Sequence, residues 1–123
     1  MMVHRITKLV CIFMVLGMVG CYYDVEEEIY PTLECESQGM SYQNDILPLI
    51  DDNCYVCHSA AANFGNVNLE GYTQLSAYVE NGSLLGVIKH EPGFSPMPKN
   101  LSKLLDCEIE KIESWISDGA LNN

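Results

Sequence analysis

The stretch "NCYVCHS" at residues 53–59 places two cysteines and a histidine close together, at Cys54, Cys57 and His58. Three chemistries use such a cluster: a dithiol redox pair, a metal site, and covalent attachment of a haem. The spacing Cys-x-x-Cys-His is the attachment signature of c-type haem, in which each thiol adds to a vinyl group and the histidine ligates the iron. The cluster therefore predicts one covalently bound haem c.

The other two interpretations find less support in the rest of the chain. A thioredoxin-like dithiol opens a helix that follows a strand, and no strand pattern precedes Cys54. A structural zinc site commonly takes four ligands from two closely spaced pairs, whereas Cys35 and Cys107 stand far apart in the sequence. Dithiol and zinc chemistry remain the alternatives to haem.

The first twenty residues have the pattern of an export signal. After a basic start, the apolar run at 9–19 is shorter than the roughly 20 residues that a membrane-spanning helix needs. The run leads into "MVGC", which resembles a bacterial lipobox, with Met18 where leucine is usual and Gly20 directly before Cys21. We therefore expect a lipoprotein signal peptide at 1–20 and lipid on Cys21. An ordinary signal peptide that leaves Cys21 free is the alternative.

The acidic segment at 21–40 predicts a flexible tether, which leaves 41–123 for the folded domain. Beyond residue 20, four lysines oppose seventeen acidic residues, a formal charge of 4 − 17 = −13. Such a charge argues against nucleic acid as a partner and suits redox proteins with a basic docking face. The expected location is a periplasm-facing membrane, to which the N-terminal lipid anchors the domain.

Beyond the predicted signal peptide, two cysteines have no role in the motif or in the predicted lipidation. Cys35 and Cys107 form an even pair in a chain expected to reach an oxidising compartment, so a disulfide between them is predicted. It would close a loop of about 72 residues and contribute on the order of 4 kcal/mol. Two free, buried thiols are the alternative.

Apolar periodicity predicts an all-α domain of three or four short helices with long loops, and no strand pattern is present. Helical spacing begins at Tyr42. Pro48 follows six residues later, so the helix either kinks at Pro48 or starts later, with Asp45 as its N-cap. The other expected boundaries are Thr73 and Asp106 as N-caps, Gly82 and Gly119 as stops, further turns at 83–90 and a helix-free segment at 91–100.

A second axial ligand to the iron can be sought among the remaining methionines and histidines. Met97 lies between Pro96 and Pro98, which restrict the loop and can hold a thioether pointing inward. His90 ends an apolar stretch, and Met40 precedes the first helix. Met97 is the predicted ligand, with His90 and Met40 as the alternatives.

Together these features resemble a class I cytochrome c over residues 41–123. The resemblance rests on the motif at 54–58, the proline-framed Met97, and "LLDCEIEKIESWISDGA" at 104–120, which is similar to the closing helix of that family. It implies that the first and last helices cross beside the haem, bringing Ile46, Leu49 and Ile50 near Ile112, Trp115 and Ile116. Many members have a proline soon after the haem histidine whose carbonyl accepts from its other ring nitrogen. This chain has none at 59–65, so that acceptor is left open.

An iron with both axial positions filled by protein has no place for a substrate, so we expect an electron carrier rather than an enzyme. Its partners would be other redox proteins that dock transiently through charge. The alternatives are an anchored haem subunit of a larger oxidoreductase complex, and a gas sensor or peroxidase-like protein with a labile sixth ligand. The sequence contains nothing that resembles the distal acid–base groups of a peroxidase.

Overall fold

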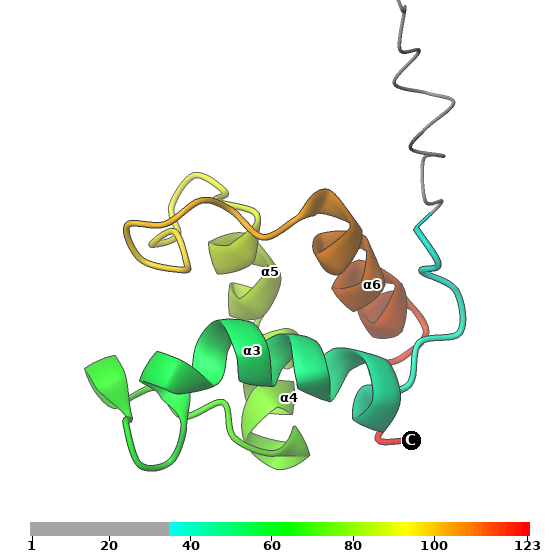
Figure 1. Cartoon of the computed structure of the whole chain (residues 1–123), viewed down its shortest axis with the longest axis horizontal. Coiled ribbons are helices and arrows are strands. Elements are labelled where there is room, and N and C mark those ends of the chain that lie inside the picture. Colours follow the sequence, from blue (N-terminus) through cyan, green and yellow to red (C-terminus); the bar gives the residue numbers. More distant parts are fainter. Residues whose placement is uncertain (1–34) are drawn as a thin grey trace, which may run out of the picture. The chain divides into compact units, whose positions relative to one another are not determined.

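Four α-helices and no strand make up the regular structure of residues 35–123, which are the residues that the computed structural model describes (Figure 1). The predicted all-α class is confirmed for this part of the chain. The predicted signal peptide, the lipidation site Cys21 and the tether up to residue 34 lie outside the described residues. None of the helices described here has the length and apolar character needed to cross a membrane.

The first helix begins with a π-helical turn, η1 (Tyr42–Ile46), which continues as α3 (Leu47–His58). Ser41 is the N-cap, so the alternative that placed Asp45 there is wrong. The Asp45 carboxylate instead accepts a hydrogen bond from the Ser41 backbone N–H at 2.8 Å. Pro48 falls in the first turn of α3, directly after the π-helical turn. A proline, which has no backbone N–H, is tolerated there better than in the interior of a helix.

Two short helices, α4 (Tyr72–Glu80) and α5 (Ser83–Ile88), follow a loop that contains a single 3₁₀ turn. Gly71, with φ 91°, precedes α4 and is its N-cap; the predicted N-cap Thr73 lies inside the helix. Gly82, with φ 74°, separates α4 from α5 as predicted, because glycine adopts a positive φ without steric cost.

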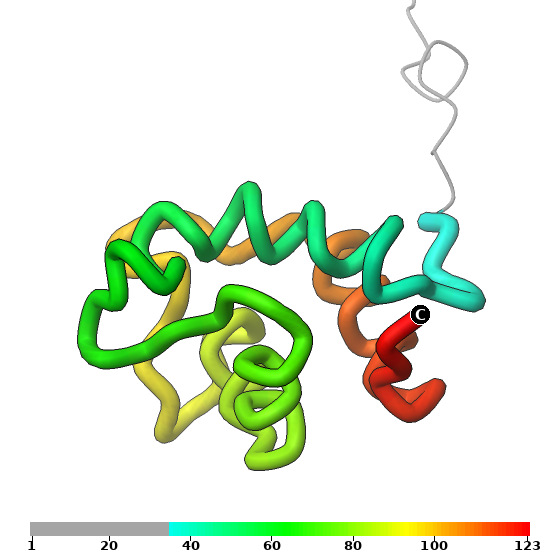
Figure 2. The backbone as a smooth tube through the Cα atoms, turned by 90° about the horizontal axis from the view of Figure 1, so that it is seen from below, coloured from blue at the N-terminus to red at the C-terminus, as the bar shows by residue number. Residues whose placement is uncertain are grey.

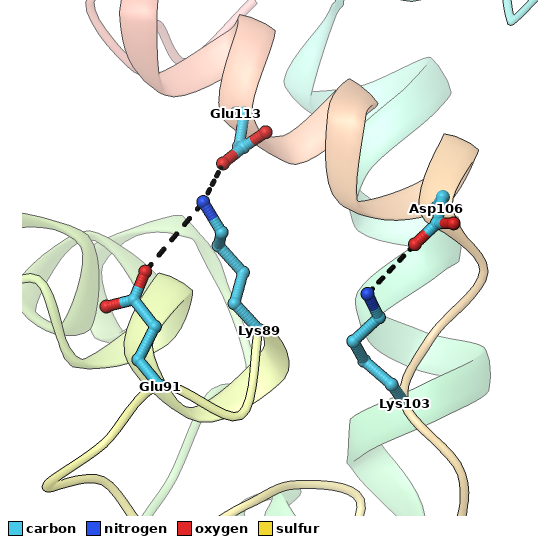
Figure 3. Close-up of polar contacts among 5 residues, drawn as sticks. All are labelled: Lys89, Glu91, Lys103, Asp106 and Glu113. Atoms are coloured by element: carbon cyan, nitrogen blue, oxygen red, sulfur yellow. Dashed lines mark hydrogen bonds and ion pairs between the residues drawn. The ribbon is translucent and has the colours of Figure 1, made fainter.

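The last helix, α6 (Asp106–Ser117), starts one residue earlier than predicted, since Leu105 is the N-cap and Asp106 the first helical residue. The Glu108 carboxylate accepts a hydrogen bond from the Leu105 N–H at 2.9 Å, and Asp106 pairs with Lys103 at 2.9 Å (Figure 3). Acidic groups in the first turn also interact favourably with the helix dipole. The chain leaves the helix through Gly119, at φ 98°, as predicted.

The contact between η1 and α6 is part of the core. Figures 1 and 2 both show α6 beside the first turns of the opening helix. The Tyr42 ring lies 5.9 Å from the Trp115 ring, centroid to centroid, and meets Tyr72 edge-on at 5.2 Å. The apolar side chains expected to meet from the two helices belong to one core cluster. Its largest fully buried members are Trp115, Ile46, Ile50, Leu75 and Ile112.

The chain's last residue also holds the start of the first helix. The Asn123 backbone carbonyl accepts from the Gln43 N–H at 3.0 Å and from the Ser41 hydroxyl at 2.9 Å. Its side-chain oxygen accepts from the Tyr42 N–H at 3.0 Å. The first N–H groups of a helix have no partner within it, so Asn123 satisfies donors that would otherwise lack one.

A disulfide joins Cys35 to Cys107, and Met40 is buried against the core. The packed unit therefore begins at Cys35, six residues before the predicted boundary at Ser41. Covalent attachment to α6 and the burial of Met40 are the physical reasons why this short segment belongs to the domain.

Replacing both Cys35 and Cys107 by serine should lower the free energy of unfolding by about 4 kcal/mol, because the bridge restricts the unfolded chain over a 72-residue separation. Urea unfolding of the oxidised protein measures the change. Wild-type protein unfolded with a reductant present should match the double variant. Equal urea midpoints for the oxidised wild type and the double variant would contradict the prediction.

Candidate functional site

A cavity of about 590 Å³ lies between the C-terminal half of α3, helix α5 and the loop that precedes α6. This volume falls within the roughly 300–1,000 Å³ of small-molecule and cofactor sites. Cys54, Cys57, His58 and Met97, the residues that the sequence predicts for haem attachment and ligation, all line this one cavity. The rest of its wall is largely apolar and includes the buried side chains of Leu69, Leu84, Ile88 and Leu104.

Helix α3 supplies the three motif residues from its last turns. Positions three and four apart on a helix share one face, so Cys54 lies on the same face of α3 as Cys57 and His58, one turn before them. Both thiols are free and half-buried. The helix thus presents two sulfur atoms and an imidazole to the same side of the cavity.

The His58 imidazole is oriented by the loop that follows it. Its Nδ1 lies 3.3 Å from the Val67 carbonyl oxygen, and the His58 carbonyl accepts from the Leu69 N–H at 2.8 Å. A carbonyl can only accept, so Nδ1 carries the proton and Nε2 keeps the lone pair that a metal ion requires. The Val67 carbonyl therefore takes the place of the acceptor that the sequence left open. The sequence could not predict this acceptor, because a backbone carbonyl is present in every residue and Val67 lies nine residues from His58.

The same loop is closed on itself and attached to α3 at its far end. The Ala60 N–H donates to the Glu70 carboxylate at 2.7 Å, which joins the two ends of the loop, and the Gly71 N–H donates to the Tyr55 hydroxyl of α3 at 3.2 Å. These contacts hold residues 59–71 in place, so the Val67 carbonyl is presented to His58 by a closed loop.

Met97 lines the cavity from the proline-rich loop after α5. Its N–H donates to the Val87 carbonyl at 3.0 Å, and its carbonyl accepts from His90 Nε2 at 3.0 Å. Of the three side chains considered as the second axial ligand, only Met97 lines the cavity. Met40 is buried in the core cluster, and the Nε2 atom of His90 is occupied by the Met97 carbonyl.

Large apolar side chains remain exposed around the cavity. Val56, Phe64 and Leu101 line it, yet they are 80%, 63% and 70% exposed. Exposed apolar groups gathered around an apolar hollow are typical of a surface that an apolar ligand covers. The sequence does not show that these side chains are exposed, because exposure cannot be inferred from residue type alone.

Cys54 lacks the environment of a reactive thiol. Burial, with a further contribution from Cys57, raises the pKa of the Cys54 thiol to about 11. A thiol with that pKa is almost entirely protonated at neutral pH, whereas redox-active cysteines have a lowered pKa.

The surroundings of the motif also lack further ligands for a zinc ion. Within residues 35–123, no three His, Cys, Asp or Glu side chains are placed to hold a metal ion together. Cys35 and Cys107 are joined to each other and are not available as ligands. One imidazole and one thioether that line the same apolar cavity have the composition of a ligand pair for haem iron.

Comparisons of this chain with family models, with curated proteins and with solved structures found no match. The site is therefore interpreted from its own residues, their contacts and the resemblance carried by the motif.

The Met97 loop depends on close contact with α5, which gives a testable prediction. A Cβ atom on Gly86 would lie 2.5–2.6 Å from three ring atoms of Phe94, so Gly86→Ala should displace this ring and lower the free energy of unfolding by about 1–3 kcal/mol. With Phe94→Ala present, the same substitution should stabilise by up to about 1 kcal/mol, because alanine favours the helix. A double-mutant cycle by urea unfolding measures both effects. The same sign in both backgrounds would contradict the prediction.

Proposed function

We propose that this chain is a single-haem c-type cytochrome, a lipid-anchored electron-transfer protein that acts outside the cytoplasmic membrane. The observation that carries the proposal is that Cys54, Cys57, His58 and Met97 line one apolar cavity. They supply two thioether attachment points and a His/Met pair of iron ligands, which is the donor set of this class of protein.

The residues present fit a haem c. The cavity wall is largely apolar, as a porphyrin requires, and the exposed Val56, Phe64 and Leu101 offer apolar surface that a bound macrocycle would cover. The Nδ1–Val67 contact leaves His58 Nε2 as the nitrogen available for the iron. The loop contacts hold Met97 as the second, neutral ligand.

A bound haem supplies one-electron chemistry at the iron. With haem bound, His58 and Met97 would supply the two protein ligands to the iron, which would leave no position for a substrate and favours electron transfer over catalysis. The neutral thioether of Met97 would raise the reduction potential, and the apolar cavity wall would limit the access of water. The hydrogen bonds that hold His58 and Met97 would limit rearrangement on electron transfer.

The packing of η1 against α6 supports the finer assignment of a cytochrome c-like fold. In class I cytochromes c, the first and last helices cross beside the haem. Here, Ile46 of the opening helix shares a core with Ile112 and Trp115 of α6, and α3 continues from that contact to the cavity.

The charge distribution supports a partner protein with a basic face. Lys89 lies 2.6 Å from Glu113 and 3.8 Å from Glu91, while Lys103 pairs with Asp106 (Figure 3). Two of the four lysines beyond residue 20 are thus paired with carboxylates, and the many other acidic side chains there leave a net negative charge. Weak, charge-guided docking is typical of transient electron-transfer complexes.

The visible absorption spectrum of protein matured in a haem-attaching host tests the proposal. We expect a sharp α band on reduction, colour that remains with the protein after denaturing extraction, and a weak sulfur-to-iron band in the oxidised form. Replacing both Cys54 and Cys57 by alanine should abolish covalent retention of the colour. A colourless wild-type protein would overturn the proposal and return the motif to zinc or dithiol chemistry.

Met97→Ala should keep the covalent haem but lose the sulfur-to-iron band, lower the reduction potential and let the ferrous protein bind CO. Met40→Ala is the matched control, because Met40 is buried in the core and does not line the cavity. It should keep the band while lowering the free energy of unfolding by about 2–5 kcal/mol. Ready CO binding by the wild type at neutral pH would instead favour a sensor or enzyme with a labile sixth ligand.

A further inference from the structure

We propose that His90 is a positioning residue for Met97: its imidazole holds the Met97 carbonyl and thereby keeps the thioether at the cavity wall. This inference rests on the proposed function, in which Met97 ligates the haem iron. It gives a role to a side chain that the sequence analysis considered only as a rival ligand.

The first observation is the way in which the Met97 backbone is held. Its carbonyl accepts from His90 Nε2 at 3.0 Å, and its N–H donates to the Val87 carbonyl at 3.0 Å. Both polar groups of Met97 are therefore bonded to residues at the end of α5. The imidazole contact is the only one of the two that depends on a side chain, and therefore on residue type.

The second observation is that the loop has little else to hold it. All residues at 91–96 are exposed, and Met97 itself is only half-buried. Phe94 provides one apolar contact, where its ring covers Gly86. A loop with so little buried apolar surface depends on its hydrogen bonds for its conformation. The bond from His90 spans the whole loop, since it joins residues seven positions apart.

The third observation is the backbone conformation of His90. Its φ of 57° lies in the left-handed region, which is uncommon for residues other than glycine, although histidine, asparagine and aspartate adopt it more often than the rest. The chain reverses there, and the Glu91 N–H donates to the Gly86 carbonyl at 2.9 Å directly after the turn. This reversal directs the half-buried imidazole toward the end of the loop, where it meets Met97.

The test is competition for the sixth iron position by added imidazole, followed optically in the oxidised holoprotein. His90→Gly removes the side chain but keeps the backbone, because glycine adopts a positive φ without strain. We expect the apparent affinity for imidazole to rise about five- to tenfold, with partial loss of the sulfur-to-iron band. His90→Gln, whose amide N–H has a similar reach, should stay within about twofold of the wild type.

Two further variants separate positioning from general stability. His90→Asn keeps the left-handed backbone but has a shorter side chain, so it should shift the imidazole affinity in the same direction as His90→Gly. If His90→Gly does not fold, His90→Asn provides the test of the positioning role in its place. Tyr72→Phe is the matched control, since it removes a 2.8 Å hydrogen bond to the Ala120 carbonyl and Tyr72 does not line the cavity. It should lower the melting temperature and leave the imidazole affinity unchanged.

The outcomes are distinguishable. Wild-type imidazole affinity and an intact sulfur-to-iron band in His90→Gly and His90→Asn would overturn the positioning role while leaving the proposed function in place. Loss of a nitrogen ligand from the iron in these variants would show that His90 is itself the ligand, which also overturns it. A wild-type protein with covalent haem but no sulfur-to-iron band would overturn Met97 ligation, and this inference with it.

Discussion

The rest of the structure depends on the contact between the opening turn of the first helix and α6. Ile46, Ile112 and Trp115 are fully buried there, and Asn123 satisfies the helix N-terminal donors beside them. The disulfide fixes the same region covalently. Since α3 continues directly from η1, this packing sets the direction in which the Cys54–His58 segment points, and hence where one wall of the cavity lies.

At the cavity, backbone groups position the side chains. His58 is oriented by the Val67 carbonyl, and Met97 is held by the Val87 carbonyl and the His90 imidazole. In the proposed cytochrome, each axial ligand would thus be supported by its own loop. The two loops differ in construction: residues 59–71 are closed by the Ala60–Glu70 contact and attached to α3 through Tyr55, whereas residues 91–96 are all exposed.

The Cys54 thiol and the exposed apolar side chains around the cavity agree with the proposed haem site. A raised pKa for Cys54 disfavours thiolate chemistry, and Val56, Phe64 and Leu101 leave apolar surface uncovered around the cavity. The cavity between α3, α5 and the loop before α6 is open at these exposed side chains. Small domains bury little of their surface and commonly need an additional stabilising element, so a covalently attached apolar cofactor suits both the chemistry and the stability of this fold.

The sequence by itself determined the helical class, the stops at Gly82 and Gly119, and the residue types suited to haem attachment, because these depend on local periodicity, backbone freedom and spacing. It misplaced the N-caps at Asp45, Thr73 and Asp106, since a cap is set by how the preceding chain enters the helix. Only the tertiary structure decided that Met97, and not Met40 or His90, lines the cavity, and that the Val67 carbonyl meets His58. Those relations join residues through space and through backbone atoms, which residue identity does not encode.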